Sequence, residues 1–167
     1  DLFSMSCENS FMVETDNNQY VMNKLVDGKR EYIVGQIDRK TISLTIRANL
    51  YFKPELSFQY YGNPYVSTGK YSNYRKVADS GSEDIDHRFS GLQVVTDNEG
   101  TFLQDENMRI IHDFSEWNPD FNFQEFRSNF VARWEYKTGS TLYFVWTNTL
   151  SNYESSYEPS ILRSFSG

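Results

Sequence analysis

The chain has 167 residues, of which 38% are hydrophobic and 17% are aromatic, with 13 Phe, 12 Tyr and 3 Trp. The high aromatic content excludes an intrinsically disordered chain and, with few aliphatic residues, favours β structure over a helical bundle. The formal net charge of −7 argues against nucleic-acid binding, because an acidic surface repels phosphate backbones.

The first part of the chain predicts strands of alternating character. FMVET and QYVMNK are candidate strand pieces, and DGK is a candidate turn. Residues 41–52 give the clearest period of two, which predicts a strand with one apolar and one polar face, and YIVGQIDRK indicates that it begins near Tyr32. The apolar face would carry Ile42, Leu44, Ile46, Ala48, Leu50 and Phe52.

A tight turn at 53–55 separates this strand from a second alternating run, 56–67. Pro64 lies inside that run and predicts a bulge or the end of regular pairing, because proline has no N–H to donate. Residues from about 69 to 120 are polar and rich in turn residues, so we expect one long loop there that carries a small hairpin.

A second hairpin follows the loop. Alternating runs at 126–136 and 140–149 flank a short turn at 137–140, where the glycine of KTGS can adopt positive φ. The expected fold is therefore all-β, an antiparallel meander of hairpins. Short turns alternate with long loops, as in outer-membrane barrels, although a soluble antiparallel sheet remains open.

Two segments resemble one known family. They are ELSFQYYGNPYVSTGKYSNYRKV and NPDFNFQEFRSNFVARWEYKTGSTLYFVWTNT, and the second contains the pattern RWEY-x-x-GS-x-L-x-x-VW, from Arg133 to Trp146. The family is a domain of unknown function in Gram-negative envelope proteins, which follows a module resembling family-9 carbohydrate-binding modules. The resemblance covers roughly residues 32–78 and 118–148.

The resemblance implies that residues 1–167 are a single piece of an outer-membrane β-barrel, without the N-terminal module, the earlier strands and the final strand. Five or six strands are too few for a membrane barrel, since the smallest have about eight. The expected partners are outer-membrane lipid, further strands from the same protein or another chain, and glycans. The expected location is the bacterial outer membrane.

The barrel interpretation assigns a face to each strand residue. Arg47, Arg133 and Glu135 are candidates for the lumen, where they would set the polarity of a pore, although simple structural pairing is the competing interpretation. An outward apolar band would comprise Ile42, Leu44, Ile46, Phe130, Ala132, Leu142 and Phe144. Interfacial aromatic residues would be Tyr51, Phe52, Trp134, Tyr136 and Tyr143, which a soluble aromatic core explains equally well.

Other chemistry is weakly encoded. Asp97, Glu99 and Asp105 are the candidate calcium ligands in the acidic loop, but no segment has EF-hand spacing, so no cofactor is predicted. His87 and His112 are too few for a zinc site, and Cys7 has no partner motif. No catalytic residues are identified, and a glycoside hydrolase rests on family association alone.

The sequence thus predicts a structural or transport component of the outer membrane, linked to glycan binding or uptake. One alternative is a carbohydrate-binding accessory protein that acts through its extracellular loops. Another is a soluble β-sandwich that serves as a binding module.

Overall fold

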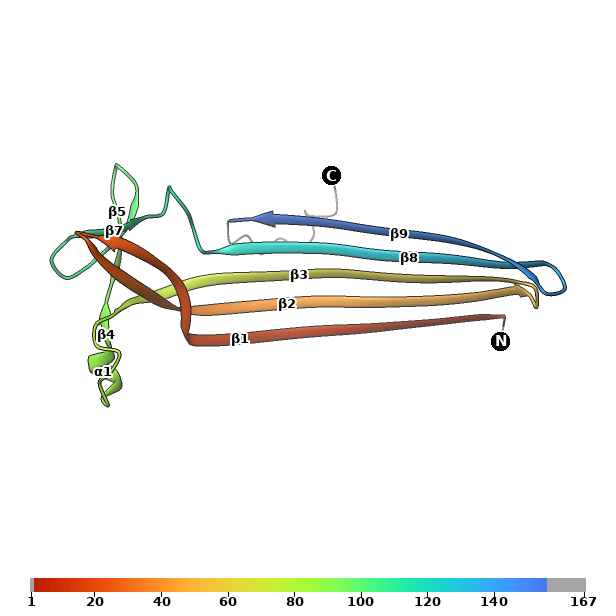
Figure 1. Cartoon of the computed structure of the whole chain (residues 1–167), viewed down its shortest axis with the longest axis horizontal. Helices are drawn as coiled ribbons and strands as arrows, with labels where there is room; N and C mark the ends of the chain where they lie inside the picture. Colours follow the sequence, from red (N-terminus) through yellow and green to blue (C-terminus); the bar gives the residue numbers. More distant parts are fainter. Residues whose placement is uncertain (1, 156–167) are drawn as a thin grey trace.

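The fold is a long antiparallel sheet with a small second sheet at one end (Figure 1). The computed structural model describes residues 2–155, except for the side chains of residues 85 and 86. The elements are β1 (Phe3–Val26), β2 (Lys29–Lys53), β3 (Leu56–Val77), α1 (Ile85–Arg88), β4 (Phe89–Gly91), β5 (Gln93–Thr96), β6 (Thr101–Gln104), β7 (Ile110–Asp113), β8 (Phe121–Lys137) and β9 (Ser140–Glu154).

The order of strands in the main sheet is β1-β2-β3-β8-β9, and β4 pairs with the end of β3. The four predicted spans lie within β2, β3, β8 and β9, so the all-β antiparallel fold and the hairpins are confirmed. The pairing of β3 with β8 joins the two predicted hairpins. Closure of the sheet into a barrel is not seen among residues 2–155, where β1 pairs with β2 and β9 pairs with β8.

The strands are longer than the alternation predicted. The segment expected as two pieces at the start of the chain is one strand, β1, which pairs with β2 along almost its whole length. β3 runs to Val77, so the long connection begins at residue 78, and the predicted boundary at 69 is wrong. Residues 67–72 have little apolar alternation, but backbone pairing with β2 holds them in the sheet regardless of side-chain character.

The β1–β2 turn is the predicted DGK turn. Asp27 and Gly28 both have positive φ, 50° and 79°, as a two-residue type I′ turn requires. The β1–β2 pair extends beyond the rest of the sheet and bends over its end (Figure 1). β1 has two register shifts in this region, between Asp16 and Gln19 and between Tyr20 and Met22, and such bulges bend a strand and increase its twist.

Replacing Gly28 should loosen this hairpin tip. Gly28→Ala forces a side chain into the left-handed region, at a cost of about 1–2 kcal/mol. Amide hydrogen exchange near the turn should accelerate accordingly. Gly91→Ala is the matched control, because Gly91 has no positive φ and a Cβ there meets open space. Equal exchange in the two variants would contradict the turn assignment.

Pro64 does not create the predicted bulge. The β2–β3 register is unchanged on its two sides, with Ser43 opposite Tyr65 and Ile46 opposite Gly62. This register places Leu44 opposite Pro64, which has no N–H to offer, and the side-chain amide of Asn63 donates instead to the Leu44 carbonyl at 3.0 Å. The side chain of the preceding residue therefore supplies a donor where the proline cannot. Around Pro64, regular pairing is lost only at Leu44 and Thr45 and resumes at Ile46 in the same register.

The long connection is a folded cap, with more structure than the single hairpin expected there. β5, β6 and β7 form a three-stranded antiparallel sheet beside the bent β1–β2 hairpin (Figure 1). A small core joins this cap to the main sheet. Its buried members are Val21, Ile33, Tyr74, Leu92, Leu103 and Ile111.

The cap covers one face of the main sheet. On β2, alternate residues Ile33, Gly35 and Ile37 are buried, whereas Tyr32 on the other side is 49% exposed. Side chains an even number of positions apart lie on the same side of a regular strand, so Ile33 and Ile37 share a side of β2 with Arg47. The register shifts in this stretch add residues to β1 and β3, not to β2. The cap therefore lies over the polar side of the sheet.

Candidate functional site

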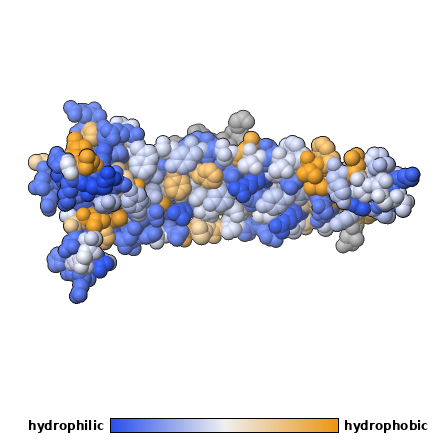
Figure 2. Space-filling view, viewed as in Figure 1, coloured by the Kyte–Doolittle hydropathy of each residue, from blue (hydrophilic) through white to orange (hydrophobic). Residues whose placement is uncertain are grey.

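The main sheet has two chemically different faces. Residues opposite each other across strands share a face, so the register settles the assignment. The apolar face carries all seven residues expected in the outward band, and its rows include Met5–Ala48–Tyr60–Phe130–Trp146 and Phe3–Leu50–Phe58–Ala132–Phe144. Figure 2 shows apolar side chains recurring along the strands, between more polar ones.

The polar face carries the three residues predicted for a lumen, but it does not join them in one network. Arg133 contacts Glu135 at 3.3 Å, and Glu135 also accepts the backbone N–H of Gly139 in the β8–β9 turn. Arg47 lies in a separate row, over the ring of Tyr61 at 5.7 Å from its centroid. These are local contacts of the structural kind, and a role in setting pore polarity stays a prediction.

The five predicted interfacial aromatic residues all lie near the tight turns, and each is at least 47% exposed. They do not share one face. Trp134 pairs with Leu142 on the apolar face, whereas Tyr143 pairs with Arg133 on the polar face, where Tyr51 also lies opposite Ser57. Phe52 and Tyr136 occupy irregular positions beside the turns. A single lipid-facing girdle of all five is therefore incompatible with the register.

The candidate calcium ligands do not converge. Asp97 accepts the backbone N–H groups of Glu99 and Gly100 in the β5–β6 turn, while Asp105 is buried beyond the other end of β6. Among the residues the structure describes, no group of three His, Cys, Asp or Glu side chains could hold a metal ion. The run of β6 separates carboxylates that are close in sequence.

The two histidines are also apart. The ring of His112 is buried and lies 2.7 Å from the carbonyl oxygen of Trp117, whereas His87 is exposed and contacts Asp84. Cys7 is exposed on β1.

A charged cluster ties the cap to the main sheet. The buried carboxylate of Asp105 contacts Lys76 of β3 at 3.3 Å and Arg109 at 3.2 Å. Arg109 in turn reaches Asp27 and Glu31 of the β1–β2 hairpin, at 3.1 and 3.6 Å. Burial acts to raise the pKa of Asp105, but N–H groups of Arg109 and Asn107 and the ammonium of Lys76 outweigh it, so the pKa lies below its usual value.

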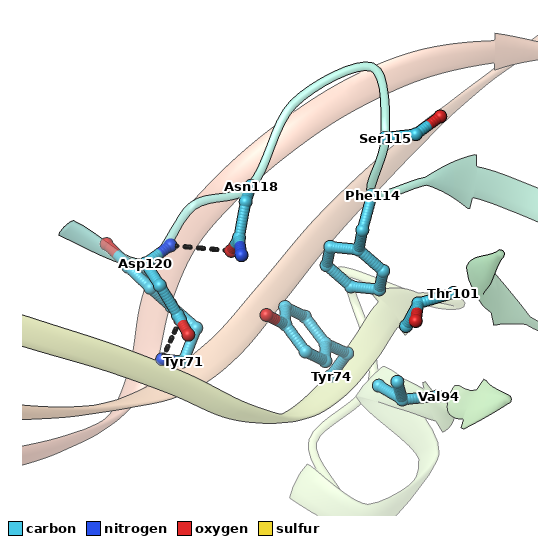
Figure 3. A pocket seen from close by; sticks show the side chains of 8 residues that line it. All are labelled: Tyr71, Tyr74, Val94, Thr101, Phe114, Ser115, Asn118 and Asp120. Carbon is cyan, nitrogen blue, oxygen red and sulfur yellow. Dashed lines mark hydrogen bonds between the residues drawn. The ribbon is translucent and has the colours of Figure 1, made fainter. Parts of the chain in front are cut away.

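A hollow of about 450 Å³ opens between the cap and the end of β3 (Figure 3). Its lining comes from β3, β5, β6 and the segment that follows β7. The lining residues are Tyr71, Tyr74, Val94, Thr101, Phe114, Ser115, Asn118 and Asp120. Aromatic rings and polar groups thus face the same space.

A bulge in β3 brings the two tyrosines together. Asn73 has a positive φ of 49°, and the β2–β3 register shifts by one residue at this point. The extra residue reverses the alternation, so Tyr71 and Tyr74, three positions apart, lie on the same side of the strand. Tyr74 then packs against Phe114, with ring centroids 5.7 Å apart.

Two side chains of the hollow are fixed by backbone donors. Asp120 Oδ1 accepts the N–H of Tyr71 at 2.7 Å, and Asn118 Oδ1 accepts the N–H of Asp120 at 3.0 Å (Figure 3). Burial raises the pKa of Asp120, and the Tyr71 N–H and Lys70 only partly offset it. Burial likewise raises the pKa of both Tyr71 and Tyr74, so these hydroxyls are neutral at physiological pH.

Comparison with known proteins gives one relationship. Residues 1–167 match the family described as Domain of unknown function (DUF5916). The chain belongs to this family. No curated protein and no solved structure matches it. Within the described residues of this DUF5916 chain, no helix is long and apolar enough to cross a membrane.

The sequence of this DUF5916 chain did not reveal the hollow. Its residues come from a strand end and from a segment interpreted as loop, and no motif links them. The signals that were present are NPD at residues 118–120, where Asn and Asp favour capping of nearby backbone N–H groups, and the closely spaced tyrosines Tyr71 and Tyr74. Neither signal indicates which distant segments meet.

Proposed function

We propose that this chain forms part of the wall of an outer-membrane β-barrel and serves as a structural or transport component of the bacterial envelope. The observation that carries the proposal is the apolar face, which extends across all five long strands and is open to the surroundings. Phe11 of β1 is 67% exposed, and Phe144 and Leu150 of β9 are 59% and 60% exposed.

The dimensions of this face suit a bilayer. On β3 the apolar face runs from Val66, opposite Ile42, to Leu56, opposite Trp134, which is ten residue steps or about 33 Å along the strand at roughly 3.3 Å per residue. The strands of membrane barrels tilt by about 35–45°, which reduces this length to a height of about 25 Å, the height of their outward apolar band. The charged residues Arg47, Arg133 and Glu135 are on the opposite face, where a water-filled interior would solvate them.

The edges of the sheet suit the same function. In the part of the chain that the structure describes, β1 and β9 each pair on one side. Unpaired backbone groups are costly in lipid, so the proposal requires further strands, from the same protein or from another chain, to pair with them. A carbohydrate-binding module attached to such a barrel would link it to glycan handling.

The proposal is tested by producing residues 1–167 alone and measuring their size by light scattering, with and without detergent. We expect association in plain buffer, because exposed apolar side chains and open edges drive it, and smaller particles in detergent. A stable monomer in plain buffer would refute the membrane proposal and favour a soluble β-sandwich.

A further inference from the structure

The geometry of the hollow at the cap points to a binding site for a neutral sugar ring, which we propose as a further function of this chain. The site is formed by the residues of Figure 3 and goes beyond the proposed role in the membrane. It does not depend on that role, because its residues belong to the cap and to the adjoining end of β3.

The shape and lining of the hollow suit a small molecule. Its volume of about 450 Å³ falls within the range of roughly 300–1,000 Å³ that is typical of ligand sites. Tyr71 and Phe114 are among the residues that line the hollow, and neither side chain is fully buried. The C–H groups on one side of a sugar ring carry a slight positive charge, and they pack well on the negative face of an aromatic ring.

The polar groups of the hollow can both accept hydrogen bonds from hydroxyl groups and donate hydrogen bonds to them. Asp120 uses one oxygen for the Tyr71 N–H, and its carboxylate has capacity for further donors. Asn118 uses its oxygen for the Asp120 N–H, which directs the amide nitrogen to act as a donor. Neighbouring hydroxyls of a sugar each donate and accept, so an acceptor and a donor that are both held by the backbone suit them.

The charge of the hollow selects against other classes of ligand. Among the lining residues that the structure describes, the carboxylate of Asp120 is the one charged group and there is no lysine or arginine, so an anionic ligand would be repelled. A metal site is not favoured, because the described lining offers a single carboxylate and, among the described residues, no group of three His, Cys, Asp or Glu side chains could hold a metal ion. A wholly apolar ligand would desolvate the second oxygen of Asp120 and the amide nitrogen of Asn118 without offering them a hydrogen bond, which is costly.

The hollow also has a neighbour of similar character. A second hollow of about 390 Å³ lies on the polar face of the main sheet, lined in part by Tyr65, Phe121 and Phe123. Tyr71 is two residues beyond Gly69, the partner of Phe121, on the same face of β3. A chain of sugar units that occupied the first hollow would therefore meet further aromatic side chains along this face.

The test uses the full-length protein on a glycan array that contains neutral and acidic oligosaccharides, followed by calorimetric titration of the strongest ligand. Two variants change the ligand-facing atoms but keep the structural acceptors. Asp120→Asn retains an oxygen for the Tyr71 N–H, and Asn118→Asp retains one for the Asp120 N–H. Asp97→Asn is the matched control, because Asp97 also accepts backbone N–H groups but lies outside the hollow.

We expect neutral oligosaccharides to bind, and each of the two variants to lower the affinity about tenfold or more. Asp120→Asn removes the charge from a hydrogen-bond acceptor, and Asn118→Asp replaces an amide donor with an acceptor. Asp97→Asn should bind as the unchanged protein does. Limited proteolysis will verify that the cap is folded in each variant. Binding to acidic glycans alone, no glycan binding, or equal affinity in all three variants would each overturn the proposal.

Discussion

On the proposal that the apolar face meets lipid in the outer membrane, Leu44→Arg should impair assembly of the protein there. Leu44 lies on the apolar face one row in from Ile42, in the same row as Phe126 and Leu150, with Pro64 directly opposite. A charged arginine on the lipid-facing side costs roughly 2–4 kcal/mol at the membrane midplane and less toward the interfaces, so we expect a loss of about 1–3 kcal/mol at this position. Denaturant unfolding of the full-length protein in lipid vesicles measures this loss, and the amount recovered in the outer-membrane fraction should fall with it.

The matched control is Thr45→Arg, one residue along the same strand and on the opposite face. Thr45 pairs with Glu8 of β1, so a new arginine there gains an acidic neighbour, and it faces the solvated side of the sheet. Its cost should stay below about 1 kcal/mol, the usual range for surface substitutions and exposed ion pairs. Equal losses at positions 44 and 45 would show that the apolar face does not meet lipid.

Asp105→Ala should detach the cap from the sheet. Asp105 is 5% exposed, and its loss leaves Lys76 without its carboxylate partner and removes the acceptor for the N–H groups of Asn107 and Arg109. Removing one partner of a fully buried pair costs about 3–5 kcal/mol, and because the side chain of Arg109 is 36% exposed we expect about 2–3 kcal/mol here. Cleavage of the cap in limited proteolysis should accelerate roughly 30-fold or more, since each 1.4 kcal/mol is a factor of ten.

The neighbouring Glu106→Ala is the control. Glu106 is exposed, so the cap of this variant should be cleaved as slowly as that of the unchanged protein.

Low pH should have the same effect as Asp105→Ala. The pKa of Asp105 is lower in the folded cap than in the unfolded chain, where it is about 3.9, so its contribution to stability is present above the unfolded value and is lost as the pH falls through the folded one. If the rate of cap cleavage does not rise as the pH falls below about 3.9, the role of Asp105 is contradicted.

The sequence was most informative where one chemical rule acts alone. Alternation predicted the two faces of β2, β3, β8 and β9, because successive side chains of a strand point to opposite faces of the sheet and these two faces differ in polarity. The DGK and KTGS turns were predictable because positive φ restricts the residue type, and Gly28 and Gly139 both have it. The pattern that begins with RWEY indicated a family of unknown function, and the chain belongs to such a family, DUF5916.

The sequence was less informative where a distant partner decides the structure. Residues 67–77 lack alternation and are strand because β2 continues beside them. Pro64 indicated a bulge because the sequence does not reveal that the Asn63 side chain would donate in its place. The hollow could not be predicted for the same reason: Tyr74 meets Phe114 only because a bulge at Asn73 and the packing of β7 both occur.

The uneven spacing of the connections has a consequence for the order of folding. β1–β2, β2–β3 and β8–β9 are joined by two-residue turns, whereas β3 and β8 are separated by residues 78–120. The three local pairs can form by zipping from their turns, but the β3–β8 pair must first close a long loop, which costs entropy before any contact rewards it. A cap that folds early would shorten this search by holding the end of β3 near the start of β8. We therefore expect the cap to act as an internal assembly aid, which determines how quickly the two halves of the sheet unite.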